Sequence, residues 1–274
     1  MSQAFAERYG PWAIVTGASS GIGEALAVAL SRRGVNPLVV ARRTDELERV
    51  AAEIRRRGGG GEVLGLDLAQ PQSVDRLQQH TADRDVGLVV CNAGINPEGE
   101  FEELTPATHE RIVDVNVRAP LLLARAFLPR LVRRGRGGFL ITGSIEGFVG
   151  FPHSATYSAS KGFVRALAEA LWGEYRRHGI DILALAPGAT DTPLLRRNGF
   201  EPGELPGLLS ADAVAEFALD HLRNGPWAVP GITNRIMAAA LTHAPRRLIL
   251  PVLGKAMRAA HRKAKSRLAA PGAK

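Results

Sequence analysis

The chain has 274 residues, of which 45% are hydrophobic and 23% are charged, and its formal net charge at pH 7 is +8. This composition predicts one sizeable globular domain, or at most two. Cys91 is the only cysteine, which excludes an internal disulfide and fits a reducing cytoplasm. No apolar stretch of signal-peptide length opens the chain, and no charge-free apolar run reaches ~18 residues, so neither export nor a transmembrane helix is expected.

Short apolar runs alternate with helix-like patterns along the chain. The runs that predict strands are 12–17, 36–43, 62–68, 86–94, 137–144, 181–188 and 227–230. The segments that predict helices are 22–33, 45–57, 71–80, 106–133, 155–177 and 210–223. The alternation indicates βαβ units, and the nearly continuous apolar strands indicate burial on both faces. We therefore expect an α/β fold with a doubly wound (Rossmann) parallel sheet of seven strands and helices on both faces.

The positive charge lies at one end of the chain. Residues 225–274 contain ten Lys or Arg and no Asp or Glu, which leaves positions 1–224 with a net charge of −2. This shift predicts an oxidoreductase-sized body at 1–230 and a basic helical C-terminal extension at 231–274. No aromatic residue follows Trp227 to stack on bases, so the basic extension does not indicate a nucleic-acid-binding protein.

The extension contains an amphipathic pattern between residues 249 and 265. Pro251 is tolerated only in a first turn, so we expect the helix to begin there. One face of the helical wheel is apolar (Ile249, Val252, Leu253, Ala256, Met257, Ala260 and Ala264), and the opposite face is basic (Lys255, Arg258, Arg262 and Lys265). Three alternatives remain open: docking on the protein's own core or a second subunit, weak contact with an anionic membrane surface at its inner face, or a disordered end.

The stretch TGASSGIG at 16–23 joins the first strand to the first helix. Gly17, Gly21 and Gly23 allow a sharp turn and a close approach of the backbone to a pyrophosphate at the helix N-terminus. The spacing is G-x-x-x-G-x-G, and a simple tight turn is the alternative. The strand–turn–helix context favours nucleotide binding.

The end of the second strand bears on the choice of dinucleotide. An NAD site usually places a carboxylate there for the ribose 2′-hydroxyl, whereas this chain has Arg42 and Arg43. A guanidinium pairs with a 2′-phosphate, so NADP(H) is favoured over NAD(H). The alternative is that the two arginines only begin a solvated helix.

Tyr157 and Lys161 are four residues apart on a predicted helix, which places them on one face. A nearby cation favours the phenolate and lowers the pKa of a tyrosine from ~10. The pair is therefore a candidate proton donor near neutral pH. The alternative is a half-buried tyrosine beside a solvated lysine.

Several motifs occur together in one order. They are TGASSGIG at 16–23, LDL at 66–68, CNAG at 91–94, VDVNV around Asn116, ITGSIEG around Ser144, YSASK at 157–161 and PGATDT at 187–192. With this ordered set, the chain resembles the compact branch of the short-chain dehydrogenase/reductase family over roughly residues 10–230. Cys91 departs from the family, which often has asparagine at that position.

The resemblance implies a role for each matching residue. Tyr157 would be the general acid/base, Lys161 would lower its pKa and bind the nicotinamide ribose, and Ser144 would position the substrate oxygen. Asn116 would hold a water of a proton relay. The implied cofactor-binding residues are Gly17, Ser19, Ser20, Gly21, Ile22, Gly23, Arg42, Arg43, Asp67, Leu68, Asn92, Ala93, Gly94, Tyr157, Lys161, Pro187, Gly188, Thr190 and Thr192.

The implied function is an NADP(H)-dependent oxidoreductase, a carbonyl reductase or alcohol dehydrogenase, that interconverts a carbonyl and a secondary alcohol by hydride transfer without a metal. The alternatives are an NAD-dependent alcohol dehydrogenase of the same family and a non-catalytic nucleotide-binding scaffold. The presence of all four of Asn116, Ser144, Tyr157 and Lys161 argues against the scaffold. The helices at 106–133 and 155–177 commonly pair between subunits in the family, which implies a homodimer or homotetramer.

The substrate is expected to be an apolar small-molecule carbonyl or alcohol. Two segments, 145–153 and 193–207, would flank the site and carry Ile145, Phe148, Val149, Phe151, Leu194, Leu195 and Phe200. These residues indicate an apolar pocket, although several of them are equally explained as loop anchors. His153 could contact substrate, and a structural role is the alternative.

Overall fold

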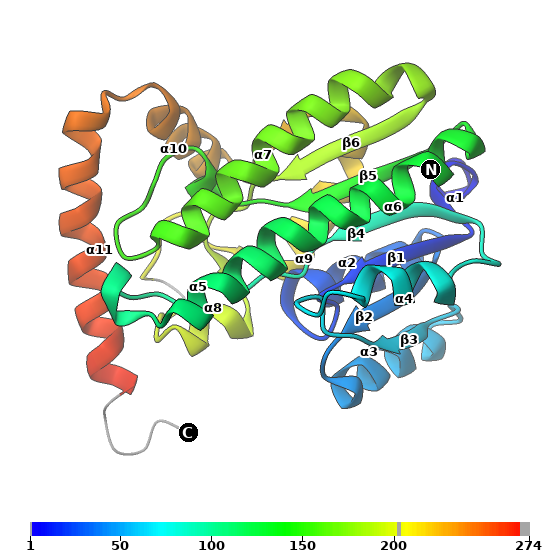
Figure 1. The fold of residues 1–274 in the computed structure, drawn as a ribbon, viewed down its shortest axis with the longest axis horizontal. Helices are drawn as coiled ribbons and strands as arrows, with labels where there is room; N and C mark the ends of the chain where they lie inside the picture. Colours follow the sequence, from blue (N-terminus) through cyan, green and yellow to red (C-terminus); the bar gives the residue numbers. More distant parts are fainter. Residues whose placement is uncertain (1, 202–203, 269–274) are drawn as a thin grey trace.

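The computed structural model describes residues 2–201 and 204–268, and its centre is a parallel sheet with helices on both faces (Figure 1). The sheet order is β3-β2-β1-β4-β5-β6-β9, and every neighbouring pair is parallel. Its strands are β1 (Trp12–Thr16), β2 (Asn36–Ala41), β3 (Glu62–Gly65), β4 (Val86–Cys91), β5 (Gly137–Thr142), β6 (Ile180–Leu185) and β9 (Trp227–Ala228). The predicted doubly wound fold of seven strands is confirmed.

The strand order reverses between β1 and β4. From β1 the chain moves outward to β2 and β3, and it then returns to β4 on the other side of β1. The loops after β1 and β4 therefore separate, which opens a crevice at the carboxyl ends of these strands. Two short strands, β7 (Thr190–Asp191) and β8 (Leu209–Ser210), pair beside this crevice.

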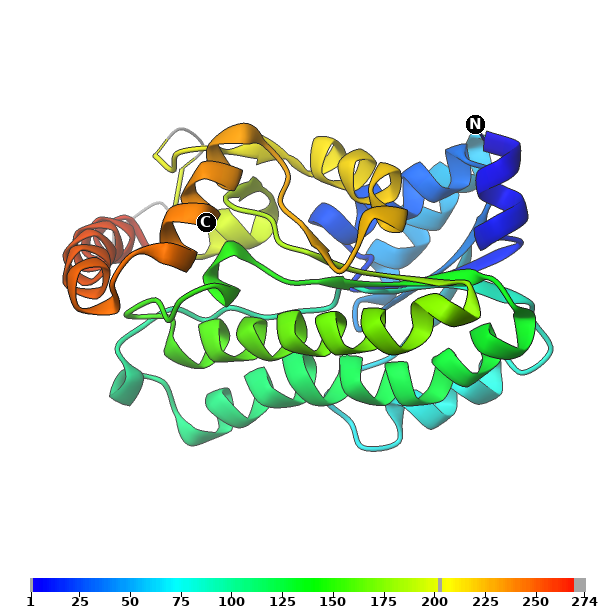
Figure 2. The same cartoon turned by 90° about the horizontal axis from the view of Figure 1, so that it is seen from above.

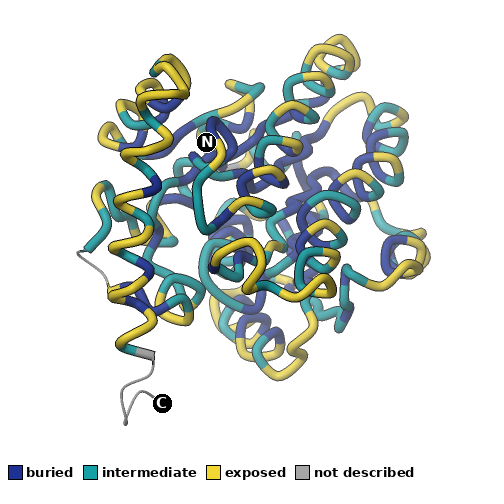
Figure 3. The backbone as a smooth tube through the Cα atoms, turned by 60° about the vertical axis from the view of Figure 1, so that its left-hand side comes forward, coloured by how far each residue is buried: buried dark blue, intermediate teal, exposed yellow. Residues whose placement is uncertain are grey.

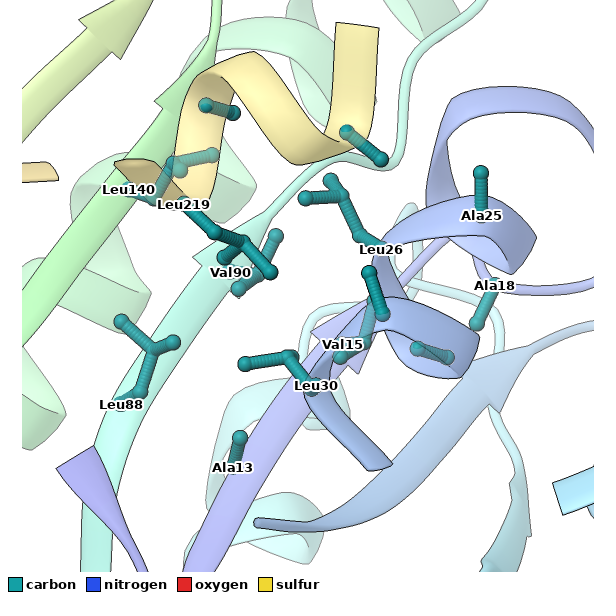
Figure 4. Close-up of a cluster of buried hydrophobic side chains, with 14 of the residues drawn as sticks. Ala13, Val15, Ala18, Ala25, Leu26, Leu30, Leu88, Val90, Leu140 and Leu219 are labelled. Atoms are coloured by element: carbon teal, nitrogen blue, oxygen red, sulfur yellow. The ribbon is translucent and has the colours of Figure 1, made fainter. Parts of the chain in front are cut away.

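One face of the sheet is covered by α2 (Gly21–Arg32), α3 (Thr44–Arg56) and α9 (Ala211–Asp220). Leu26 and Leu30 of α2 recur at helical spacing and are fully buried. They pack against the sheet together with Leu219 of α9 (Figure 4). Burying each leucine stabilises the folded protein by about 1.5–3 kcal/mol. The packing holds α2 on the sheet, and with it the glycine turn that leads into α2.

The opposite face is covered by α4 (Ser73–His80), α6 (Ala119–Arg134) and α7 (Ala155–Tyr175), and α5 (Pro106–Val113) packs against α7. In Figure 2, α6 and α7 run alongside each other across this face. Fully buried apolar side chains, among them Phe127 and Phe139, fill the space between these helices and the sheet.

The predicted helix at 106–133 was wrong in one respect, because a π-helical turn (η2, Asp114–Arg118) separates α5 from α6. The amide of Ala119 donates to the carbonyl of Asp114, which is the five-residue spacing of a π turn. Pro120 has no backbone N–H for the Asn116 carbonyl, so the ordinary ladder is already broken there. Hydrophobic periodicity along the sequence does not reveal the one extra residue of a π turn within a helix.

The sequence did not predict α1 (Ser2–Tyr9), which packs at the edge of β4 and β5. Tyr9 is 2% exposed and donates a 2.7 Å hydrogen bond to Asp181, and Arg8 Nε lies 2.5 Å from the same carboxylate. A helix of this length is marginal alone, so these contacts from distant residues stabilise it.

The basic extension forms α10 (Ile232–His243) and α11 (Arg246–Leu268), as the predicted helical appendage requires. In Figure 1, α11 stands at the edge of the molecule opposite α1. The helix begins before Pro251, where we expected its start, because the amides of Leu248 and Ile249 both bond to the Pro245 carbonyl. Pro251 has no N–H to donate to the carbonyl of Arg247 one turn earlier. That turn is exposed, so water can bond the carbonyl instead.

One side of α11 docks on the rest of the protein, which is the first of the three alternatives for the extension. Figure 3 shows buried and half-buried stretches along one side of this helix and exposed stretches on the other. Of the predicted apolar face, Val252 is 63% exposed and Ala256 is also exposed, whereas Leu253, Met257 and Ala260 are half-buried and Ala264 is buried. Among the residues that the structure describes, no helix has the length and low charge needed to cross a bilayer.

Candidate active site

A continuous cavity of about 530 Å³ opens at the carboxyl ends of the central strands. The glycine turn and the end of β2 line one part of it, and α7 and the loops after β4, β5 and β6 line the next. The far part is lined by residues of the 194–200 segment, by Leu205 and Pro206, and by α11. The cavity therefore connects the predicted nucleotide site with the predicted substrate site.

The glycine turn has the shape of a dinucleotide cradle. Gly17 and Gly21 have φ values of +66° and +62°, a conformation that side chains disfavour. A Cβ atom on Gly17 would lie 2.7 Å from the Ala93 Cα, and one on Gly21 would lie 3.0 Å from Thr192 Cγ2. The N-cap residue Ser20 makes no side-chain cap bond, so the first turn of α2 retains amides for an anion.

Gly23 has a packing role and does not line the cavity. A Cβ atom there would overlap the Gly17 carbonyl oxygen. Asn92 holds the same turn from the other side, because its amide nitrogen donates to the carbonyls of Thr16 (3.2 Å) and Gly17 (3.3 Å). The turn is thus fixed from the β4 loop, and Ser19, Ser20 and Ile22 remain at the cavity surface.

Arg42 and Arg43 both border the cavity at the end of β2. The Arg43 guanidinium donates to the hydroxyls of Ser19 (3.1 Å) and Ser20 (3.4 Å), so it lies over the glycine turn. Burial alone would raise the pKa of Asp67. The hydrogen bonds from Arg111 and from the Ala69 amide, together with the positive charges of Arg111 and Arg42, outweigh burial and hold that pKa below its usual value.

Tyr157 and Lys161 both line the cavity from α7, and Ser144 faces it from the loop after β5. The Lys161 ammonium donates a 2.7 Å hydrogen bond to the Thr142 carbonyl and is 4% exposed. Burial lowers the pKa of Lys161 to about 8, although the Glu146 carboxylate opposes this shift. At neutral pH the lysine is still largely protonated.

The expected lowering of the Tyr157 pKa is wrong for the unliganded protein. Burial and the nearby Glu146 carboxylate raise this pKa, and only the Ser144 hydroxyl lowers it. The cost of burying a phenolate, together with repulsion from the Glu146 carboxylate, therefore outweighs the hydrogen bond from Ser144.

Asn116 lies behind the cavity wall and does not line it. Its side chain is 2% exposed, accepts from the Ile95 amide (3.0 Å), and donates to the Ile95 carbonyl (3.0 Å) and to Ser160 (3.1 Å). These bonds join the π-helical turn to the β4 loop and to α7. The predicted relay water at Asn116 remains a prediction.

The other implied cofactor residues border the cavity. Leu68 follows Asp67 after β3, Ala93 and Gly94 follow β4, and the 187–192 segment follows β6. The lining residues of that last segment include Pro187, Gly188, Thr190 and Thr192. Both ends of a dinucleotide would therefore meet residues that the sequence had singled out.

Two cavity carboxylates were missed by the sequence analysis. Glu146 accepts a 3.2 Å hydrogen bond from Ser158, and its pKa is raised by burial. Glu98 accepts from Asn198 (3.2 Å), and burial together with Glu146 raises its pKa to about 7. Glu146 follows Ser144 by two residues and could have been suspected from that position. The sequence gives no comparable signal for Glu98.

The substrate end of the cavity is apolar, as predicted. Of the seven residues expected there, Ile145, Phe151, Leu194, Leu195 and Phe200 line it. Phe148 and Val149 pack instead in a separate core cluster with α10 residues. His153 does not line the cavity and stacks on His261 of α11, with 5.4 Å between ring centres, so its contacts are structural.

The comparisons with known proteins agree with this geometry. A family model described as short chain dehydrogenase matches residues 11–201. A 7beta-hydroxysteroid dehydrogenase from Clostridium sardiniense is 32% identical over 222 residues, which cover 81% of this chain and 83% of that protein. Among solved structures, a short-chain dehydrogenase from Sphingobium yanoikuyae in complex with NADPH has a TM-score of 0.78 and 32% identity, with coverage of 87% and 95%.

A second solved structure is a bulky-bulky ketone specific alcohol dehydrogenase from Comamonas testosteroni. It has a TM-score of 0.72 and 27% identity, and the match covers 88% of this chain and 99% of that one.

Proposed function

The chain belongs to the short-chain dehydrogenase family, and we propose that within it this protein is an NADP(H)-preferring enzyme for bulky apolar ketones and secondary alcohols. Its reaction class follows from the family: it is an oxidoreductase that interconverts a carbonyl and an alcohol and uses a nicotinamide dinucleotide. The observation that carries the finer proposal is one cavity shared by the glycine turn, the Ser144–Tyr157–Lys161 group and an apolar pocket.

The nicotinamide would supply hydride to the substrate carbon. The chain's own residues handle the proton and the developing charge. The Tyr157 phenol donates its proton to the carbonyl oxygen as that oxygen gains negative charge, and the Ser144 hydroxyl donates a second hydrogen bond to the same oxygen. The Lys161 ammonium stabilises the tyrosinate that remains. Its hydrogen bond to the Thr142 carbonyl holds it beside Tyr157. In oxidation the tyrosinate takes the alcohol proton.

The proposed preference for NADP(H) rests on Arg42 and Arg43. Both guanidinium groups border the cavity at the end of β2, and Arg43 already bonds two hydroxyls of the glycine turn. A 2′-phosphate at this place would meet two cations, and Asp67 is partly neutralised by Arg111. This arrangement favours a phosphorylated ribose over a free one.

The proposed substrate class rests on the apolar end of the cavity. Leucine, phenylalanine and methionine side chains dominate that end, and the relatives include enzymes named for hydroxysteroids and for bulky ketones. A panel of steroid ketones and small ketones, monitored by NADPH absorbance, tests the proposal. We expect higher kcat/KM with a 7-ketosteroid than with cyclohexanone. Turnover of cyclohexanone alone would contradict the bulky class, and turnover of no ketone would contradict the function.

We propose a homodimer or homotetramer that assembles through α5, α6 and α7. Val113, Leu121 and Phe163 on these three helices are 46%, 43% and 37% exposed, so each offers apolar surface that a second subunit could bury. Light scattering of the wild type and of a Leu121→Glu, Phe163→Glu variant tests the assignment. A monomeric wild type would contradict it.

We propose two functional units, the oxidoreductase domain at 1–230 and the basic extension at 231–274.

We further propose that the exposed face of α11 makes weak contact with an anionic membrane. Lys255, Arg258 and Arg262 are exposed and form no ion pair within the described residues, and the apolar Leu248 and Val252 lie on the same helix at 68% and 63% exposure. Basic and apolar residues together suit an anionic lipid surface.

A further inference from the structure

We infer that α11 is a wall of the substrate pocket and determines how large a substrate the enzyme accepts. This inference rests on the proposed function. Four residues of α11, which we call the inner face, line the same cavity as Tyr157: Leu253, Ala256, Met257 and Ala260. The basic extension is therefore part of the active site as well as a surface feature.

The C-terminal half of α11 is held to the pocket loops by ion pairs. Arg267 forms two contacts with Glu204, at 2.5 and 2.6 Å, and Lys263 contacts the same carboxylate. Lys265 pairs with Glu103 at 2.8 Å. We call these five residues the clasp. An isolated exposed pair contributes only about 0–1 kcal/mol, but a carboxylate shared by two cations forms a network and is stronger.

Close backbone contact fixes where this half of the helix lies. Gly199 has a φ of +80°, and a Cβ atom added to it would lie 2.9 Å from the Ala264 Cβ. Ala264 itself is 2% exposed. The helix therefore meets the 194–200 segment with two small residues in contact, which sets its distance from the apolar side chains of that segment.

The N-terminal half of α11 is fixed independently. The Arg246 guanidinium donates to the carbonyls of Leu241 and Phe148. Ile249 and Leu253 pack against the core cluster that contains Phe148 and Val149. Because both halves are anchored, the inner face between them has a defined position opposite the catalytic group.

Two positions of the inner face carry small side chains. Ala256 lies between Leu253 and Met257, and Ala260 lies about one turn beyond Ala256; both place only methyl groups at the cavity. Larger side chains at the alanine positions would occupy space that a bulky substrate needs. A small substrate held near Ser144 and Tyr157 would not reach them.

Two leucine substitutions of the full-length protein test this wall. Ala260→Leu fills the pocket, whereas Ala259→Leu places the same side chain at the exposed neighbouring position. We expect Ala260→Leu to lower kcat/KM for a 7-ketosteroid by about tenfold or more and to leave that for cyclohexanone within about twofold. Ala259→Leu should change neither. Equal effects of the two variants, or an equal loss with both ketones, would overturn the inference.

A second experiment tests the clasp as a set of positioning residues. Glu204→Gln should raise KM for the 7-ketosteroid and leave its kcat nearly unchanged. It should also reduce the dependence of KM on NaCl between about 0.05 and 0.5 M, because only the Lys265–Glu103 pair of the clasp remains. Lys255→Gln, which removes an unpaired charge from the same helix, should behave as wild type. If Glu204→Gln raised KM for cyclohexanone as well, or lowered kcat with either ketone, a role specific to the bulky-substrate pocket would be wrong.

Measuring ketone binding as well as turnover distinguishes a failure of the pocket wall from a failure of the proposed function. Calorimetric binding of the 7-ketosteroid to the wild type, Ala260→Leu and Ala259→Leu proteins needs no turnover. Absence of ketone reduction, with weakened binding in Ala260→Leu alone, would contradict the function but support the pocket wall. Normal reduction with no difference between the leucine variants would contradict only the wall.

Discussion

The Lys161 ammonium lies 5.3 Å from the centre of the Tyr157 ring, and its hydrogen bond goes to the carbonyl of Thr142 at the end of β5. The sheet therefore fixes the position of the lysine, and the lysine in turn lies beside the phenol. This geometry assigns the proton to Tyr157 and the electrostatic support to Lys161 in the proposed mechanism.

Tyr157→Phe should lower kcat by about 10²–10⁴-fold, because it removes the proton donor and little else. The affinity for NADPH, measured by fluorescence titration, should stay within about twofold. Tyr175→Phe on the same helix is the control, since Tyr175 lies outside the cavity lining. Turnover of Tyr157→Phe at the wild-type rate would rule out the assigned donor.

Glu146→Gln should lower the pKa of Tyr157, because the Glu146 carboxylate is one of the groups that raise it. The measurement is the alkaline tyrosinate absorbance of the unliganded protein, taken as a difference from Tyr157→Phe.

Glu100→Gln is the matched control for that titration, because Glu100 is 52% exposed and does not line the cavity. A midpoint that does not move in Glu146→Gln, or that moves equally in both variants, would contradict the role given to Glu146.

Arg42→Asp should raise KM for NADPH by about tenfold or more and leave KM for NADH nearly unchanged, because the new carboxylate repels only a 2′-phosphate. Arg76→Asp makes the same charge change at an exposed site on α4 and should affect neither cofactor. A wild-type enzyme with equal kcat/KM for both cofactors would show that the arginines do not select NADP(H).

The full-length protein should float with anionic vesicles more than with neutral ones, and about 0.5 M NaCl should release it. Replacing Arg247, Lys255, Arg258 and Arg262 with Gln should abolish this binding, since each cation contributes about 1 kcal/mol near such a surface. Four Arg→Gln changes, at Arg49, Arg55 and Arg56 of α3 and at its C-cap residue Arg57, are the control. Equal flotation of both variants would contradict a role for α11.

Much of the fold could be predicted because hydrophobic periodicity reports elements that are buried along their length. The helix expected at 22–33 is found at Gly21–Arg32, and the one expected at 45–57 is found at Thr44–Arg56. Features that depend on distant contacts were missed. The clearest case is α1, which is stabilised by Asp181 at the start of β6.

The residues of the candidate site also fall into those that local sequence reveals and those that depend on distant contacts. Tyr157, Lys161 and the glycine turn could be found because their spacing along the chain is itself the signal. Glu98 lies in a loop whose path is set by Asn198, about a hundred residues away, so local sequence gives no sign of it. The inner face of α11 was read as amphipathic, but the periodicity did not show that it would meet the cavity.

The single cysteine has a practical consequence. Cys91 is 5% exposed at the end of β4, and burial raises the pKa of its thiol, so it stays protonated and out of reach of alkylating reagents in the folded protein. A cysteine introduced at the exposed position 259 would then be the one reactive thiol in the native chain. A fluorophore attached there would report, in real time and without mutating the wild-type thiol, whether α11 moves when a ketone enters.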